Sequence, residues 1–148
     1  MIVALGADHA GAELKDRLAE LLRREGHELI DRGTDSSESV DYPDFAEAVA
    51  ADVSAGRADR GLLVCGTGIG MAMAANKIRG VRAANVRSVE EAELSRQHND
   101  ANILCLGARF IDPQVAEDVL NAWLKTDFEG GRHVRRVEKI GKLEGPQQ

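Results

Sequence analysis

Cys65 and the glycines after it are the residues whose types and spacing most clearly suggest a chemical role. The short apolar run 61–65 ends at this cysteine, and Gly66, Gly68 and Gly70 follow at alternate positions. Glycines in such a turn let several backbone N–H groups point toward one place, and a helix that starts there adds its positive end, so the segment favours an anion. The alternative is a buried structural cysteine beside a tight turn.

A thiolate beside such amides suits one class of reaction. It can remove a proton from the carbon next to a carbonyl, because the amides stabilise the enediolate oxygen that forms. The positive field also favours the thiolate over the thiol. The segment around Cys65 therefore indicates proton transfer at carbon.

The glycine pattern does not establish a nucleotide site. Gly66, Gly68 and Gly70 followed by Met71 do not complete the G-x-G-x-x-G fingerprint, and no acidic residue closes a second strand about 20 positions further on. No lysine stands in the Walker position, and we find no cluster with metal-ligand spacing. The sequence thus predicts neither a cofactor nor a metal.

His98, Asn99 and Asp100 lie between a predicted helix and the next predicted strand. Imidazole is the side chain best suited to proton transfer near neutral pH, so His98 is a second catalytic candidate. The alternative is that His98 is a cation at a helix C-terminus and that the other two are turn residues.

The C-terminal segment 132–140 concentrates positive charge in an acidic chain. Arg132 and Arg136 are four residues apart and share a helical face, whereas we expect Val134, Val137 and Ile140 to face the protein for packing. Two guanidinium groups on one face can bind a phosphate through charge-assisted hydrogen bonds. A solvated basic face is the alternative.

The elements that position these residues alternate between short apolar runs and helical spacing. Strands are predicted at residues 2–5, 27–31, 61–65, 81–86 and 103–106. Helices are predicted from about residue 12 to Gly26, from Asp41 through Val53, from Met71 to Lys77, from Ser88 to His98, from Asp112 to Leu124, and after Gly131.

This alternation predicts an α/β fold with a five-stranded parallel sheet covered by helices on both faces, and a basic C-terminal helix. Ligands of such sheets bind beyond the carboxyl ends of the strands. Asp8 and His9 follow the first strand, the Cys65 segment the third and Arg109 the fifth, so we expect them at that edge. Cys105, with leucine on either side, is expected in the core.

The composition sets the class of protein. The 148 residues are 43% hydrophobic and 30% charged, which is typical of one globular domain spanning residues 1–148. A net charge of −6 argues against nucleic-acid binding. Two cysteines without an apolar leader predict a cytoplasmic protein, and no run is long enough to span a membrane.

These separate signals coincide with one family. The sequence closely resembles ribose-5-phosphate isomerase type B, whose family also contains galactose-6-phosphate isomerase subunits. The matching stretches cover nearly the whole chain, and they are residues 6–11, 41–43, 65–70, 75–77, 95–102 and 129–133.

The resemblance implies a Rossmann-like three-layer sandwich, a homodimer or dimer of dimers, and active sites completed across the subunit interface. It implies that Cys65 moves a proton between C2 and C1 of the sugar and that His98 assists ring opening. It further implies substrate contacts from Asp8, His9, Gly66, Thr67, Gly68, Ile69, Gly70, Asn99, Arg109, Arg132 and Arg136. Thr67 is a candidate for the proton shuttle between O1 and O2.

The expected activity is interconversion of ribose 5-phosphate and ribulose 5-phosphate without cofactor or metal. Galactose 6-phosphate isomerases divide their functional residues between two different subunits, whereas here the full set lies on one chain. Alternatives are an isomerase of a six-carbon sugar phosphate such as allose or galactose 6-phosphate, a non-catalytic nucleotide-binding module, and an interaction protein that docks through its basic helix.

Overall fold

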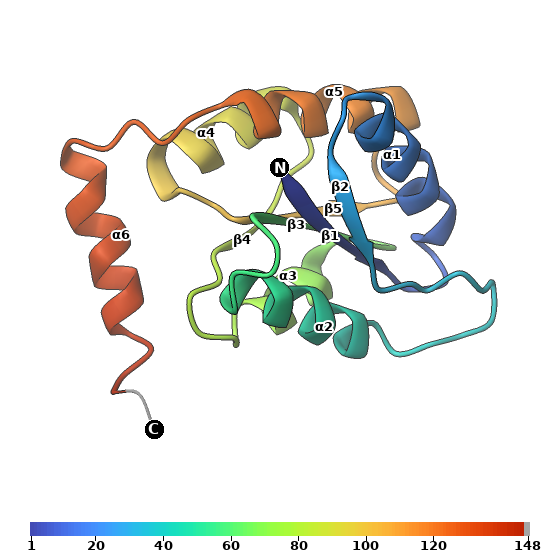
Figure 1. The fold of residues 1–148 in the computed structure, drawn as a ribbon, viewed down its shortest axis with the longest axis horizontal. Coiled ribbons are helices and arrows are strands. Elements are labelled where there is room, and N and C mark those ends of the chain that lie inside the picture. The colour runs from blue at the N-terminus through green and yellow to red at the C-terminus, as the bar shows by residue number, and fades with distance from the viewer. Residues whose placement is uncertain (147–148) are drawn as a thin grey trace.

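The chain forms a parallel sheet between two layers of helices. A computed structural model describes residues 1–146, so the last two residues of the expected domain lie outside the described part. The strand order is β2-β1-β3-β5-β4, and every pair is parallel (Figure 1). The strands are β1 (Ile2–Ala7), β2 (Glu28–Asp31), β3 (Arg60–Cys65), β4 (Ala83–Asn85) and β5 (Ile103–Gly107).

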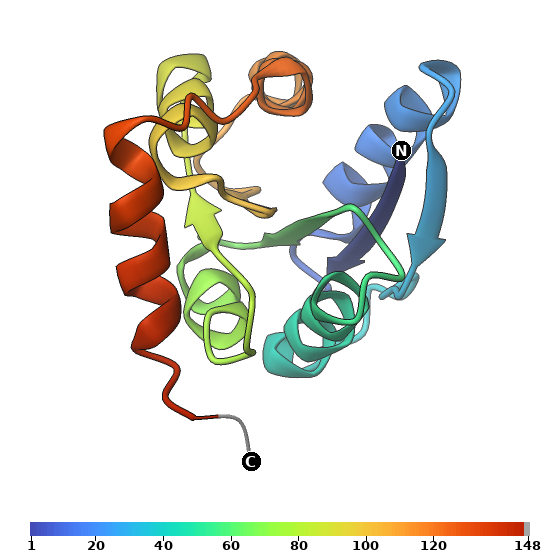
Figure 2. The same ribbon diagram turned by 60° about the vertical axis from the view of Figure 1, so that its left-hand side comes forward.

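Helices cover both faces of this sheet (Figure 2). One face carries α1 (Ala12–Arg24), α4 (Val89–Asn99) and α5 (Pro113–Lys125), and the other carries α2 (Tyr42–Ser54) and α3 (Ile69–Ala75). The sixth helix, α6 (Arg132–Lys142), stands beyond β4 and packs against α4 (Figure 1). The predicted three-layer α/β fold with its basic C-terminal helix is confirmed.

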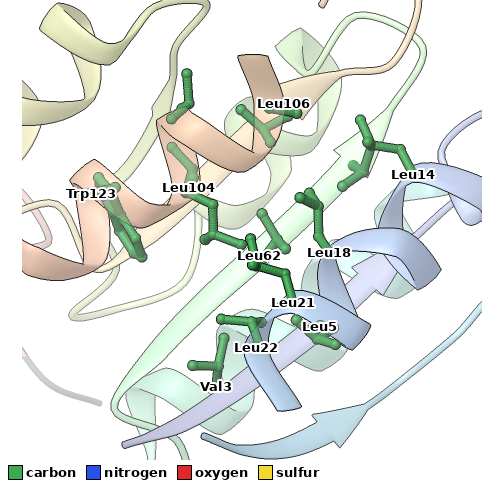
Figure 3. Packing of buried hydrophobic residues seen from close by; sticks show 14 of the residues in the cluster. Val3, Leu5, Leu14, Leu18, Leu21, Leu22, Leu62, Leu104, Leu106 and Trp123 are labelled. Atoms are coloured by element: carbon green, nitrogen blue, oxygen red, sulfur yellow. The ribbon is translucent and has the colours of Figure 1, made fainter. Parts of the chain in front are cut away.

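Aliphatic side chains fill the core on both sides of the sheet. On the α1 and α5 side, Leu18 and Leu22 pack over Leu5 and Leu62, with Trp123 fully buried nearby (Figure 3). Alternate residues of each strand point to opposite faces. The central strands are therefore apolar throughout, which is why they read as continuous runs.

Two predicted elements have different bounds. The strand expected at 81–86 is shorter, since only Ala83–Asn85 form β4. At its start, the side chains of Asn102 and Asn76 accept hydrogen bonds from the N–H groups of Arg82 and Ala83 at 2.7 and 2.8 Å. The helix expected from Met71 to Lys77 begins at Ile69 and ends at Ala75.

The apolar residues of α6 are a clear correction. Val134, Val137 and Ile140 were expected to pack inward, yet Val134 and Ile140 are 40% and 44% exposed and Val137 is half-buried. The helix contacts the rest of the chain mainly at α4, so its apolar stripe finds no cover among residues 1–146.

Within the same residues no helix has the length and apolar character that a membrane crossing needs.

The buried carboxylate of Asp52 in α2 accepts hydrogen bonds from two arginines, and this arrangement leads to a prediction about stability. Asp52 is fully buried, accepting hydrogen bonds from Arg32 Nε and Nη2 at 2.7 Å and from Arg57 Nε at 2.8 Å. The hydrogen bonds from Arg32, reinforced by Arg57, hold the pKa of Asp52 below its usual range. The ionised carboxylate therefore stabilises the fold above the unfolded-state pKa of about 3.9, and this contribution is lost as the pH falls through the lower folded-state pKa.

Replacing Asp52 with asparagine should lower the free energy of unfolding by about 1–3 kcal/mol at neutral pH. The difference from the wild type should shrink below a pH of about 4, as measured by urea unfolding at a series of pH values. Asp118→Asn, at an exposed position of α5, is the matched control and should change little. A difference that stays constant from pH 7 to pH 3 would contradict an ionic role for Asp52.

Candidate active site

Cys65 is the last residue of β3, between β1 and β5, in the middle of the sheet. Its residue is 4% exposed, and its Sγ accepts a hydrogen bond from the Gly68 N–H at 3.1 Å. Gly66, Thr67 and Gly70 beside it are partly exposed. The sulfur thus lies at the base of the turn between β3 and α3 and accepts one backbone N–H.

The turn requires glycine at position 68. Gly68 has a φ of 80°, and a Cβ added there would lie 2.5 Å from Asn85 Oδ1 and 3.0 Å from the carbonyl carbon of Leu106. The helix that follows is only seven residues long, so its macrodipole is small. The Gly68 N–H, which donates to Cys65 Sγ, is the backbone group that the turn places against the sulfur.

Gly107 lies directly against the backbone of the turn that follows Cys65. It is the register partner of Cys65 on β5, and a Cβ added to it would lie 2.4 Å from the Thr67 carbonyl oxygen. The Thr67 hydroxyl in turn accepts a hydrogen bond from the Ile69 N–H at 3.1 Å. The backbone of the turn therefore rests directly on the end of β5.

Asp8 and His9 lie at the same edge, after β1. The Asp8 N–H donates to the Val64 carbonyl at 3.2 Å, which ties this loop to β3. The Asp8 carboxylate is buried and accepts hydrogen bonds from the N–H groups of Ala10 and Gly11, so it shapes the loop. His9 is exposed, and its Nδ1 accepts a hydrogen bond from the Val40 N–H at 3.2 Å.

Arg109 and Tyr42 complete this side of the site. The Nε of Arg109 lies 3.2 Å from the position of a Cβ on Gly66, and the Tyr42 ring lies against Gly70, 2.5 Å from the corresponding position. Tyr42 was not predicted as a site residue, although it belongs to the family-like stretch 41–43. That stretch was the signal that could have found it, and the structure shows its side chain 40% exposed. We call Asp8, His9, Tyr42, residues 65–70 and Arg109 the strand-end cluster.

His98 lies elsewhere, at the C-terminal end of α4. Its ring stacks on that of His133 with the centroids 4.3 Å apart, and Glu129 Oε1 lies 3.7 Å from His98 Nε2 and 3.6 Å from His133 Nε2. Burial, together with the charges of His98 and Arg132, lowers the pKa of His133. Sequence reasoning missed Glu129 and His133 as site residues, although both belong to the family-like stretch 129–133.

Arg132 and Arg136 project from α6 near the same histidines and are exposed. We call His98, Asn99, Glu129, Arg132, His133 and Arg136 the helical cluster. Among residues 1–146 no hydrogen bond or ion pair joins the helical cluster to the strand-end cluster. One chain therefore carries the predicted residues as two separate groups.

A cavity of about 650 Å³ lies between α6 and the segment from α3 to β4. Its lining includes Asn76, Arg82, Asn99, Ile140 and Leu143. Cys65 is absent from this lining, so the hollow next to α6 is distinct from the strand-end cluster. The cavity lies where the C-terminal end of α6 faces the residues between α3 and β4.

Cys105 has the place that the sequence predicted for it. Its residue is fully buried on β5, and burial raises the pKa of its thiol. It belongs to the core on the α2 and α3 side. Cys65 belongs to the same core cluster, but its Sγ also accepts a backbone N–H at the edge of the sheet.

Comparison with known proteins identifies the family. A family model described as ribose/galactose isomerase matches residues 3–140. The chain belongs to the ribose/galactose isomerase family. Its relatives within the family include ribose-5-phosphate isomerase B of Escherichia coli K12, which is 46% identical over 142 residues, covering 96% of this chain and 95% of the relative.

Two further relatives bear on the fold and on the substrate. A solved structure of ribose-5-phosphate isomerase B from Mycoplasma genitalium with bound ribulose-5-phosphate has a TM-score of 0.95 and 42% identity, with 99% of this chain and 97% of that chain covered. A family member from Pectobacterium atrosepticum, named D-erythrulose-4-phosphate isomerase, is 41% identical over 96% of this chain and 94% of its own length.

Proposed function

We propose that residues 1–148 form a single isomerase domain that interconverts ribose 5-phosphate and ribulose 5-phosphate. The observation that carries this proposal is the hydrogen bond from the Gly68 N–H to Cys65 Sγ at the carboxyl end of the central strand. Membership of the ribose/galactose isomerase family and the relative solved with ribulose-5-phosphate support the same activity.

The reaction requires an open-chain sugar, and His98 is the residue that we assign to ring opening. Opening a furanose needs a proton to leave the anomeric hydroxyl and another to reach the ring oxygen. The His98 side chain is 40% exposed at the end of α4, so its ring nitrogens are available to a substrate. Asn99, the next residue, is assigned to binding of the sugar hydroxyls.

Cys65 then acts on the open aldose. Its thiolate takes the proton from C2, the C2–H electrons form the C1–C2 double bond, and the carbonyl electrons move to O1. The enediolate oxygen is held by the amides of residues 66–70, which need no reorganisation to accept negative charge. Return of the proton to C1, with transfer of a proton from O2 to O1 by way of Thr67, gives the ketose.

Arg109, Arg132 and Arg136 are assigned to the phosphate. A dianion needs several guanidinium donors, and the two on α6 are exposed and share one face. We expect Arg132→Ala to raise KM for ribose 5-phosphate about tenfold with a smaller change in kcat, because the phosphate contact is equal in the ground and transition states. Steady-state kinetics measure this, and Arg23→Ala, at an exposed position of α1, is the control. A fall in kcat at constant KM would instead place Arg132 at the reacting carbons.

The two clusters meet, in this proposal, between two copies of the chain. The exposed residues Val134 and Ile140 of α6 and Ile69 and Met73 of α3 offer apolar surface next to the helical and strand-end clusters. A homodimer that covers both would bring the arginines of one subunit to the Cys65 of its partner, and each dimer would hold two complete sites.

Mixing two damaged variants tests this sharing of residues, with activity measured at a substrate concentration far below KM, where each variant alone turns over little substrate. Cys65→Ala damages the strand-end cluster and Arg132→Ala with Arg136→Ala damages the helical cluster, so a heterodimer of the two contains one intact site. After subunits are exchanged at equal amounts, we expect about a quarter of wild-type activity, because half of the dimers are mixed. Mixtures that stay as inactive as the separate variants would show that each site is built within one chain.

A coupled assay for ribose 5-phosphate tests the activity itself. Allose 6-phosphate, galactose 6-phosphate and erythrulose 4-phosphate are run beside it, since the Pectobacterium relative is named for a four-carbon substrate. We expect the highest kcat/KM with ribose 5-phosphate. A higher value with a four- or six-carbon sugar would move the assignment to that substrate, and no turnover of any of the four would refute the proposed function.

A further inference from the structure

Two histidines and a glutamate come together at the end of α4 in a way that the proposed reaction does not use in full. One ring nitrogen of His98, one of His133 and a carboxylate oxygen of Glu129 all lie within 4.8 Å of one another. Among residues 1–146 the other group of this kind is Asp16, Asp31 and Asp35, which surrounds the buried ammonium group of Lys15. Only the histidine group is therefore open to an added cation.

The donor set is specific in its chemistry. Two imidazole nitrogens and one carboxylate oxygen form a three-ligand set typical of zinc sites that keep a fourth position open. Hard cations such as Mg²⁺ and Ca²⁺ prefer oxygen ligands. We therefore propose that His98, Glu129 and His133 bind one Zn²⁺, or a divalent transition metal of similar preference, and that this ion inhibits the enzyme.

The backbone already holds two of the ligands near each other. The Glu129 N–H donates to the Gln97 carbonyl at 3.1 Å, which fixes the residue beside the end of α4. The His133 N–H donates to the Gly130 carbonyl at 3.0 Å, in the turn that starts α6, and the His133 side chain is 9% exposed. These contacts place the carboxylate and the imidazole on a common side of the turn without help from a metal.

His98 is the ligand that must move. The two rings are stacked with an angle of 15° between their planes, and one ion cannot lie in both of two nearly parallel planes. His98 is 40% exposed, so its side chain can rotate, whereas His133 and the backbone of Glu129 stay in place. Zinc binding would thus open the stack and draw His98 Nε2 toward Glu129.

The inhibitory effect rests on the proposed function. An imidazole nitrogen that is bonded to zinc has no lone pair for proton transfer, so His98 would no longer assist ring opening. Within one chain, the strand-end cluster shares no hydrogen bond or ion pair with these three residues among residues 1–146, so the proposed ligands do not include the Cys65 of the same chain. The metal here is an inhibitor and has no part in the reaction.

Direct binding tests the site. Zn²⁺ is titrated into the EDTA-treated full chain in competition with a chromophoric chelator, and we expect one ion per chain. Glu129→Gln, which changes an exposed side chain, and His133→Ala should each weaken binding at least about tenfold. His27→Ala, which removes a histidine at the start of β2, is the matched control and should bind as the wild type does.

A variant of Cys65 distinguishes the proposed site from adventitious binding of Zn²⁺ by a thiolate. Cys65→Ser should retain the affinity for Zn²⁺, and the protein loaded with Co²⁺ should lack the near-ultraviolet charge-transfer band of a sulfur ligand. Loss of binding in Cys65→Ser, the presence of that band, or unchanged binding in Glu129→Gln would each overturn the proposal.

Activity measurements give the second readout. Turnover of ribose 5-phosphate should fall in proportion to zinc occupancy and return on addition of EDTA, and Glu129→Gln should resist the inhibition. A chain that binds Zn²⁺ as described but turns over no sugar phosphate keeps the metal site and refutes the proposed function. A chain that is active and binds no Zn²⁺ keeps the function and refutes the metal site.

Discussion

Replacing Cys65 with alanine is expected to lower kcat/KM for ribose 5-phosphate by about 10³-fold or more, within the range that a general base contributes. The amides of residues 66–70 stay in place in this variant, and so do the arginines, so phosphate-dependent substrate binding should be largely retained. The loss should therefore appear in kcat. Exchange of the C2 hydrogen with deuterated solvent, followed by NMR, measures the proton transfer itself and should be absent.

Cys105→Ala is the matched control for this experiment. It removes the other thiol of the chain, which lies in the core on the neighbouring strand. We expect activity close to that of the wild type and a modest loss of stability. If Cys65→Ala retained most of its activity, or still exchanged the C2 hydrogen, another group would be the base.

The second large effect is expected from Gly107→Ala. The new methyl group would have to occupy a place 2.4 Å from the Thr67 carbonyl oxygen and 2.6 Å from its carbonyl carbon, and both are backbone atoms. The turn after Cys65 must shift to make room. Because a displacement of about 1 Å in a catalytic group can cost about 10² in rate, we expect kcat to fall by about that factor.

Gly141→Ala separates this local effect from a general one. Gly141 lies in α6, and a Cβ added there meets nothing within 4 Å. We expect wild-type kinetics for that variant. Circular dichroism and urea unfolding should show that Gly107→Ala stays folded, with a stability loss of about 1–3 kcal/mol. Wild-type kcat in folded Gly107→Ala would mean that the position of the turn does not limit the reaction.

Much of the fold could be predicted because the central strands are buried on both faces. Such strands appear as continuous apolar runs, and the runs at residues 2–5, 61–65 and 103–106 lie within β1, β3 and β5. The predicted start of a helix at Ser88 was also correct, because the Ser88 hydroxyl caps α4 by accepting a hydrogen bond from the Glu91 N–H. The edge strand β4 is shorter than predicted because the side chains of Asn102 and Asn76 accept hydrogen bonds from the N–H groups of Arg82 and Ala83 at its start.

The part of the candidate site that one short segment of the chain forms could be predicted from the sequence. Cys65 and its glycines lie within a few residues of one another, and so their geometry follows from the chain itself. His98, Glu129 and His133 come from two segments about 30 residues apart, and only the packing of α6 on α4 brings them together. The apolar face of α6 was placed wrongly because periodicity shows that a stripe exists and leaves open which surface covers it.

The base and the phosphate ligands differ in how firmly the fold holds them. Cys65 ends a strand with neighbours on both sides, whereas Arg132 and Arg136 belong to a helix that contacts the rest of its own chain mainly at α4. In the dimer proposed above, the distance between the reacting carbons and the phosphate therefore depends on how the two subunits pack against each other. Substitutions on the outer side of α6 could then retune the enzyme for a shorter or longer sugar while the bond-making atoms remain where they are.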